Sequence, residues 1–261
     1  MIIIKTKEEI EILREGGKRL ATVLYKVKEK VAPGISTKEL DLYAEKLIRE
    51  MGDTPAFLNY RPAGAKTPFP ASLCISVNDE VVHGIPNKNR ILKEGDIVSL
   101  DLGLKHEGLF TDMALTVIIA VPGGKINPTN KKLLDITEKA LSVAIDAAQG
   151  GNTTGDIGYA VESFVHAQKT KLGIVEVLSG HGVGRAIHED PYIPNFGKPG
   201  KGEKLVPGMV IALEPMLNIG TKNVTLDDDG YTFRTADGKK SAHFEHTVLI
   251  TEGGPEILTK T

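Results

Sequence analysis

Hydrophobic and polar positions alternate along residues 96–120, and this pattern indicates a β-hairpin. The run DIVSLDLGL is followed by the short polar turn KHEG and then by LFTDMALTVIIA. Because strand side chains alternate between two faces, one face of the hairpin is apolar while the other carries Asp101 and Asp112. A turn centred between His106 and Glu107 would place the two aspartates directly opposite each other.

Two opposed carboxylates need an explanation. Their Cβ atoms would lie about 5 Å apart, and the charges would repel by about 3 kcal/mol at an effective dielectric constant near 20. A shared proton or a bound cation would relieve the repulsion. A different register that leaves one aspartate in solvent would relieve it as well, so the hairpin alone does not decide among these.

Capping signals and helical periodicity predict four helices. Thr6 with Glu9, and Ser36 with Glu39, fit the capping-box pattern at the start of the first two. The helices are expected over residues 6–30, 36–51, 128–148 and 154–171. Strands are expected near residues 74–82, 96–104, 109–120, 175–179, 208–217, 230–235 and 241–251.

A weak internal repeat relates two of these helices. GISTKELDLYAEKLI (34–48) aligns with GNTTGDIGYAVESFV (151–165), and each is a capped helix after a glycine turn. Two unrelated helices with the same start signals would look alike, so the alternative stays open. A genuine repeat predicts two related halves around one sheet system with a site at their junction. We expect an α/β (α+β) fold in a single domain over residues 1–261, since no Ser/Pro/Gly-rich linker divides the chain.

Composition limits the classes of function that the chain could have. The net charge of −2 implies no bulk attraction to nucleic acid or membrane, and the basic run GKPGKGEK (197–204) has the glycines of a solvated loop. The single cysteine, Cys74, cannot form an internal disulfide, which fits a reducing cytoplasm. We expect no signal peptide and no membrane span.

Three further stretches place an acid or an imidazole among small or apolar residues. They are SGHGVGR with His181, VIALEPML with Glu214 and SAHFEHTVLI with Glu245. Taken singly, each residue is explained by solvent contact or an ordinary hydrogen bond, and the glycines around His181 match no phosphate-loop pattern. Together with Asp101 and Asp112, they make a set of five candidate ligands with four carboxylates and one imidazole. Burial of four negative charges requires compensation, and two divalent cations would supply it. Such ligands suit Mn, Fe, Co or Zn alike.

This set strongly resembles the methionine aminopeptidases. The resemblance rests on the five residues above and on CISVNDEVVHGIP, SGHGVGRAIHEDP and ALEPML, and it extends from the first helix to Ile257. The absence of a long insertion between His181 and Glu214, and of an N-terminal extension, indicates type I. The resemblance implies the pita-bread fold, with two pseudo-symmetric halves and a central antiparallel sheet flanked by helices. One departure is RPAGAKTPFPAS (61–72), which is longer than expected for compact bacterial members and lies where the methionine pocket should be.

The resemblance also implies an activity and a metal site. The activity is removal of the N-terminal initiator methionine from nascent proteins and peptides, with a small second residue preferred. Asp112 and Glu245 would bind both metal ions, Asp101 would bind one ion, and His181 and Glu214 would bind the other. Water activated between the ions would attack the first peptide bond.

Catalytic and substrate-binding residues follow from the same resemblance. His188 would hydrogen-bond the carbonyl oxygen, His83 would contact the substrate nitrogen, and Glu214 would also move protons. A structural turn histidine is the alternative for His83. Asn78 lies in a loop that binds a monovalent cation in some relatives. The methionine pocket would be formed by Tyr60, Phe69, Cys74 and Tyr231, with Cys74 as a packing residue.

Two other functions fit parts of the pattern. A proline-directed aminopeptidase or dipeptidase shares the fold but normally carries a large N-terminal domain. A binding protein that has lost its metals would bind nucleic acid or ribosomes, but here all five ligand positions are present. We expect a cytoplasmic monomer that meets the ribosome transiently, with no direct nucleic-acid site.

Overall fold

The computed structural model describes residues 2–62, 64–121 and 123–261. Positions 1, 63 and 122 lie outside the described residues, so the predicted domain (1–261) and the segment 61–72 are described except at these positions.

The described chain contains four α-helices, as the sequence predicts. They are α1 (Lys7–Lys30), α2 (Thr37–Glu50), α3 (Pro128–Ala147) and α4 (Thr154–His166). The capping boxes of Thr6 with Glu9 and of Ser36 with Glu39 are present. The last helix ends at His166 rather than near residue 171, because residues 167–171 contribute no buried side chain that would hold another turn against the core.

The strands form one large and two small antiparallel sheets. The main path is β1 (Thr54–Pro55), β4 (Ile97–His106), β5 (Leu109–Ile118), β14 (Glu245–Thr251), β9 (Val210–Leu213), β7 (Gly180–Gly182) and β8 (Glu189–Ile193). Off this path, β2 (Leu73–Val77) pairs with β4, and β15 (Gly254–Ile257) pairs with β14. One small sheet holds β13 (Ser241–His243), β10 (Met216–Asn218) and β6 (Gly173–Ile174), and the other holds β11 (Val224–Leu226), β12 (Phe233–Thr235) and β3 (Glu80–Val82).

Several expected strands are shorter than the sequence predicts. Residues 175–179 form no strand, and 74–82 divides into two strands at a turn. The run 208–217 breaks at Glu214 and Pro215, since proline has no N–H to donate to a ladder. The run 241–251 breaks at Phe244, where the chain passes from one sheet to the next.

The predicted register of the central hairpin is wrong. Asp101 pairs with Ala114, and Asp112 pairs with Gly103. The two-residue turn consists of Glu107 and Gly108, which both have positive φ, as the twist-compatible hairpin turn requires. The pairing therefore differs by two residues from the expected one. Because the side-chain period is two, both aspartates still lie on the same face, as diagonal neighbours.

The internal repeat has a structural counterpart. The N–H of Gly34 donates to the carbonyl of Leu92, and the N–H of Gly151 donates to the carbonyl of Leu205, each at 2.9 Å. The helix that follows each glycine carries a capping box. In both halves the glycine turn before the helix is thus bonded to a leucine in the segment that leads to a later strand, which supports a genuine repeat.

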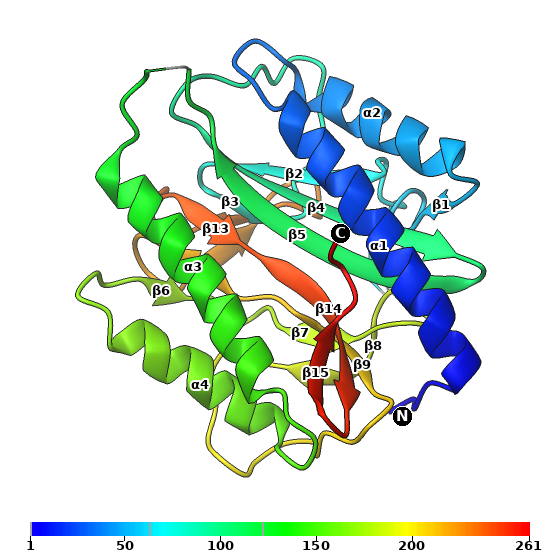
Figure 1. The fold of residues 1–261 in the computed structure, drawn as a ribbon. Helices are drawn as coiled ribbons and strands as arrows, with labels where there is room; N and C mark the ends of the chain where they lie inside the picture. Colours follow the sequence, from blue (N-terminus) through cyan, green and yellow to red (C-terminus); the bar gives the residue numbers. More distant parts are fainter. Residues whose placement is uncertain (1, 63, 122) are drawn as a thin grey trace.

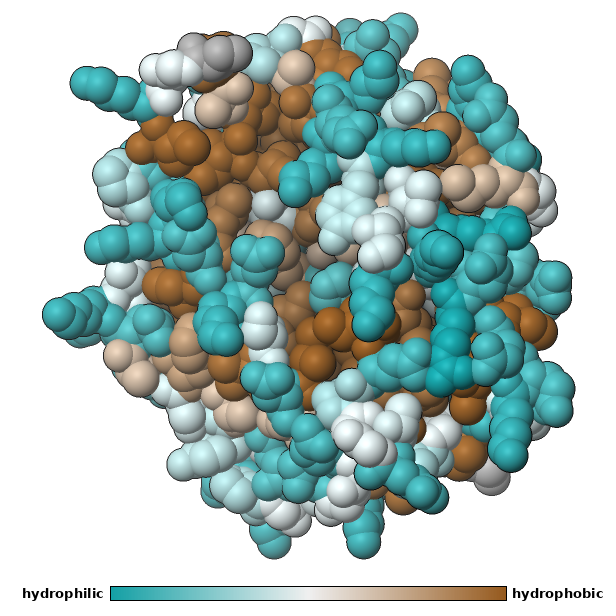
Figure 2. Space-filling model, viewed as in Figure 1, coloured by the Kyte–Doolittle hydropathy of each residue, from teal (hydrophilic) through white to brown (hydrophobic). Residues whose placement is uncertain are grey.

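The helices cover one face of the large sheet (Figure 1). In this view α1 and α3 cross in front of the strands, with α2 beside α1 and α4 beside α3. Leu100 and Leu102 of β4 belong to the main core, so Asp101 points to the opposite face. Figure 2 shows an apolar area between α1 and α3, where a groove is lined by β5 together with Tyr25 and Leu134. None of the helices in the described chain is long and apolar enough to cross a membrane.

Candidate active site

Neighbouring strands of the large sheet carry the five predicted metal ligands. Asp101 lies in β4 and Asp112 in β5, Glu245 is the first residue of β14, Glu214 directly follows β9, and His181 is in β7. These strands are consecutive in the sheet, in the order β4, β5, β14, β9 and β7. Residues 144 positions apart in the sequence, Asp101 and Glu245, are thereby brought to one site.

A small residue separates two of the carboxylates. Ala114 pairs with Asp101 on one side and with Glu245 on the other. Its short side chain leaves space between the two acids. The hydroxyl of Thr247 accepts from the N–H of Asp112 at 2.9 Å and donates to the carbonyl of Asp112 at 2.7 Å, which fixes β5 against β14.

The ligating atoms converge closely. One donor atom each from Asp112, His181 and Glu245 lie within 4.8 Å of one another. The Nε2 atom of His181 is 3.4 Å from Oε1 of Glu214. The Nδ1 atom of His181 lies 2.9 Å from the carbonyl of Gly182. If Nδ1 donates there, the lone pair of Nε2 is directed at the carboxylates, as in a metal-ligating histidine.

Burial strongly perturbs the carboxyl groups. It raises the pKa of Asp101 to about 7. Burial and then the charge of Asp101 raise the pKa of Asp112 well above its ordinary value. The pKa values of Glu214 and Glu245 are also raised well above the ordinary value, mainly by burial and then by the neighbouring aspartates. Without a cation, these raised pKa values favour the protonated forms of the groups near neutral pH.

The side chains at this site are suited to binding divalent metal ions. The Oδ1 atom of Asp101 and the Oε1 atom of Glu245 are buried and have no hydrogen-bond partner among the described residues. No lysine or arginine is among the described residues that line this cavity. Buried carboxylates are normally compensated, and oxygen-rich donor sets with one imidazole suit divalent cations.

His83 and His188 lie in the same cavity as the predicted ligands. Burial and then the charge on His188 lower the pKa of His83 to about 4, and burial lowers the pKa of His188. Both rings are therefore neutral at pH 7. The hydroxyl of Tyr60 lies 2.9 Å from Nδ1 of His188, and the rings of His181 and His188 stack edge to face.

The cavity walls include every predicted pocket residue. Tyr60, Phe69, Cys74 and Tyr231 all line it. The Tyr231 hydroxyl donates to the carbonyl of Thr67, and its ring meets Phe69 edge to face. Burial raises the pKa of the Cys74 thiol well above its ordinary value, so the thiol stays protonated and packs as an apolar group.

Sequence reasoning missed three residues at this site. Phe57 and Pro62 also line the cavity. The Nε2 atom of His243 lies 3.6 Å from Glu214 and 3.9 Å from Glu245. Alternation along SAHFEH places His243 on the face of Glu245, which was the available signal. Pro62 belongs to the segment 61–72 that the sequence singles out, whereas nothing marks Phe57 apart from its aromatic ring.

This fold and this site define a metal-dependent peptidase. The sequence profile of metallopeptidase family M24 matches residues 11–252. The chain is 45% identical to methionine aminopeptidase 1 of Bacillus subtilis over 260 residues, which cover 100% of both chains. The crystal structure of methionine aminopeptidase from Thermotoga maritima superposes with a TM-score of 0.92 at 40% identity, covering 100% of both chains. The chain belongs to metallopeptidase family M24, among its methionine aminopeptidases.

A proline-directed relative is more distant. The prolidase from Pyrococcus furiosus superposes with a TM-score of 0.75 at 26% identity. The match covers 99% of this chain but 66% of the prolidase. The pita-bread fold is thus shared with prolidases, while the higher identity lies with the methionine aminopeptidases.

Proposed function

We propose that this chain removes the N-terminal methionine from peptides and nascent proteins, with a small second residue preferred, and that the cavity described above is where it does so. One observation carries the proposal. Three buried carboxylates, the partly buried Glu214 and His181 line one cavity together with His83, His188 and several aromatic side chains. Acidic ligands, neutral imidazoles and an apolar pocket together suit hydrolysis of a peptide bond next to a methionine side chain.

Two divalent ions would be held by Asp101, Asp112, His181, Glu214 and Glu245. The count rests on charge, since two dications balance four carboxylates. These ligand types do not choose among Co, Mn, Fe and Zn. When bound, the ions would supply a water nucleophile active at neutral pH and polarise the scissile carbonyl.

The neutral histidines suit hydrogen bonding rather than charge. If the Tyr60 hydroxyl donates to Nδ1 of His188, the ring carries its proton on Nε2. That N–H can donate to the carbonyl oxygen as negative charge develops there. His83 would contact the nitrogen beside the scissile bond, and Glu214 would accept a proton from water and pass it to the leaving amine.

The pocket explains the choice of methionine. Phe69 and Tyr231 present aromatic surface and Cys74 presents a protonated thiol, all of which suit a thioether side chain. Phe57 and Pro62 extend this apolar wall. An apolar pocket beside the proposed metal ligands would accept one side chain before the scissile bond, as an aminopeptidase requires.

The wider setting belongs to the same proposal. Nascent substrates imply transient contact with the ribosome in the cytoplasm, and the chain would act as a single-domain monomer with no nucleic-acid site of its own. A monovalent cation near Asn78 remains a prediction. The backbone of Asn78 has a φ of 60°, and its carbonyl accepts from Ser241 at 2.8 Å.

Peptide hydrolysis tests the proposal. Metal-free protein is titrated with Mn²⁺, Fe²⁺ or Co²⁺ and given Met-Ala-Ser, with an X-Pro-Y peptide in parallel. Free methionine that appears only with metal, and no cleavage of X-Pro-Y, would support the proposal. Cleavage of X-Pro-Y alone would favour the proline-directed alternative, and no cleavage by folded protein under any metal would favour a binding module.

A further inference from the structure

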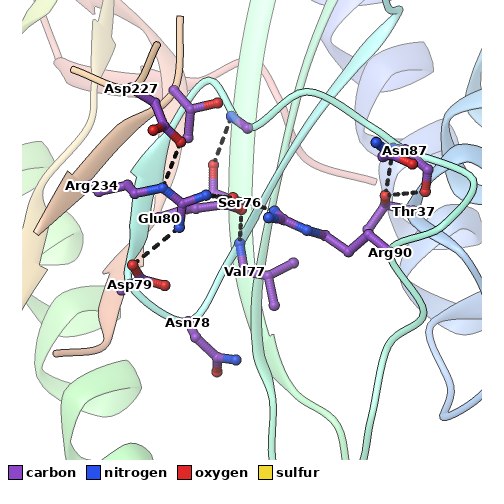
Figure 3. Close-up of polar contacts among 12 residues, drawn as sticks. Thr37, Ser76, Val77, Asn78, Asp79, Glu80, Asn87, Arg90, Asp227 and Arg234 are labelled. Atoms are coloured by element: carbon purple, nitrogen blue, oxygen red, sulfur yellow. Dashed lines mark hydrogen bonds and ion pairs between the residues drawn. The ribbon is translucent and has the colours of Figure 1, made fainter. Parts of the chain in front are cut away.

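Glu80 has a buried carboxylate that takes no part in the candidate metal centre (Figure 3). Its Oε2 atom accepts from the backbone N–H of Val77 at 2.7 Å. Its Oε1 atom accepts from Nη2 of Arg234 at 2.7 Å and from Nη1 of Arg90. One carboxylate therefore joins the end of strand β2, strand β12 and the segment that follows β3.

Arg234 extends this cluster to two more acids. Its Nε donates to Asp227 at 2.7 Å, and its Nη1 donates to Asp79 at 3.1 Å. In Figure 3 its guanidinium lies between Asp227 on one side and Asp79 and Glu80 on the other. Charge-assisted bonds of this kind are strong and set the geometry of the planar group. Arg234 thus connects the β11–β12 hairpin to strand β3.

Four consecutive residues of this hairpin reach the candidate active site or the cluster. Tyr231 lines the cavity. The hydroxyl of Thr232, which donates to Asp229 at 2.6 Å, lies 3.4 Å from the carbonyl of His83. The ring of Phe233 lies edge to face with His83, 6.0 Å between centroids. Arg234 then bonds to Glu80. The ladder between β12 and β3 shifts between Phe233 and Arg234, so the Arg234–Glu80 pair sets the register at that point.

The backbone of His83 needs this support. Its φ of 59° lies in the left-handed region, which is uncommon for residues other than glycine and persists only where the surroundings enforce it. On one side, the N–H of Gly84 donates to Oγ of Ser76 at 3.1 Å, and the carbonyl of Gly84 accepts from Ile75 at 2.9 Å. On the other side lies β3, which begins at Glu80.

We propose that Glu80 and Arg234 are positioning residues that hold His83 toward the substrate and set its place relative to Tyr231. The inference rests on the proposed role of His83. Removing the charge of Glu80 would weaken the bonds that it accepts from two guanidinium groups, so β3 and β12 would shift against each other. His83 and Tyr231 would shift with them.

Glu80→Gln tests the inference, because it keeps the shape of the side chain and removes the charge. With bound Mn²⁺, we expect kcat for Met-Ala-Ser to fall about 10-fold or more, since small displacements of catalytic groups are costly. Mn²⁺ affinity, measured by calorimetry, should not change. Arg234→Lys, which keeps the charge and loses the planar fork, should also lower kcat. It replaces Glu80→Gln as the test if that variant does not fold.

Asp53→Asn is the matched control. Asp53 is a buried carboxylate paired with Arg19 and His106, and none of the three lines the cavity. This variant should keep the kcat of the unaltered protein. An equal loss of kcat in Asp53→Asn would show that any buried carboxylate matters equally, and would overturn the inference.

Two readouts separate positioning from simple loss of stability. In a His83→Ala background, adding Glu80→Gln should reduce kcat by less than about threefold, because coupled residues are not additive. In metal-free protein, the imidazole NMR signal assigned to His83 should shift in Glu80→Gln and stay in place in Asp53→Asn. Additive losses or an unmoved His83 signal would overturn the inference. Failure of the unaltered protein to release methionine would instead count against the proposed function, and the NMR result would still decide the positioning.

Discussion

The first half of the chain presents its carboxylates from long strands, whereas the second half presents them where strands begin or end. Asp101 and Asp112 lie inside strands of 10 residues each. Glu214 follows a strand of 4 residues, and Glu245 begins its strand. The shorter aspartate side chains thus come from positions inside strands, and the longer glutamate side chains come from positions where strands begin or end.

The two halves nevertheless share one frame. Leu92 and Leu205 accept equivalent hydrogen bonds from the glycines before α2 and α4. Asp101 and Glu214 each lie 9 residues beyond these leucines. The repeat therefore gives Asp101 and Glu214 equivalent positions in the two halves. The longer side chain of Glu214 and the strand break at Pro215 allow both acids to reach the same site.

The largest expected effect comes from one acid in each half. Asp112→Asn and Glu245→Gln should each lower kcat/KM for Met-Ala-Ser by about 10³-fold or more, because both carboxylates are proposed to bind both ions. Steady-state hydrolysis at saturating Mn²⁺ measures this. Near-normal activity in either variant would mean that the halves do not share one centre.

A smaller effect, on metal affinity, should distinguish the ligands of the first half from those of the second half. Asp101→Asn and His181→Ala each remove a ligand proposed for a single ion. Each should weaken binding of one ion by at least about 10- to 100-fold, the cost of losing a mere outer-shell partner, and spare the other. Calorimetric titration of metal-free protein with Mn²⁺ would resolve the two events. If both variants weaken the same ion, the assignment of ligands to ions is wrong.

The metal-free protein should lose stability as pH rises above 6.5. Carboxyls with raised folded pKa, such as Asp101 at about 7, bind more protons folded than unfolded in this range, so the free energy of unfolding falls with pH. The neutral histidines, including His83 and His181, act oppositely, and their effect fades as pH rises past their unfolded pKa near 6.5. From pH 6.5 to 8 we expect a loss of about 1 kcal/mol or more.

Denaturant unfolding at several pH values measures this slope. Asp112→Asn removes one of the coupled carboxyls and should flatten the slope, and saturating metal should abolish it. A metal-free protein that becomes more stable between pH 6.5 and 8 would contradict the proposed carboxylate cluster.

The smallest effect concerns a contact across the halves at the mouth of the cavity. Tyr60→Phe removes the hydroxyl beside Nδ1 of His188. The loss of one hydrogen bond of about 0.5–1.5 kcal/mol should lower kcat by about 2- to 12-fold. Unchanged kcat would show that Tyr60 does not orient His188. Tyr159→Phe, which removes the same hydroxyl from an exposed side chain outside the cavity, is the control.

Local patterns in the sequence predicted much of the fold. Capping boxes fixed the starts of α1 and α2, and alternation placed Asp101 and Asp112 on one face. The register was missed because it depends on which two residues take positive φ, and Glu107 is an uncommon choice beside Gly108. The strand break at Phe244 depends on a change of sheet that no local pattern records.

The site could be predicted only in part. Its ligands stand out because acids inside apolar runs are unusual, and the resemblance set them in order. His243, Phe57 and the partners of Glu80 become neighbours of the site only when distant segments fold together. Arg234 and Glu80, for example, are 154 residues apart and meet through a cross-strand pair.

The central claim is that the four carboxylates of the cavity and His181 hold two divalent ions. Titration of metal-free protein with Mn²⁺ at pH 7.5, with heat and proton release recorded in buffers of different ionisation enthalpy, tests it most directly. The account predicts two ions per chain, release of protons from the carboxyls as they bind, and methionine release only after binding. Binding of no Mn²⁺ by folded protein, or binding without proton release, would contradict it.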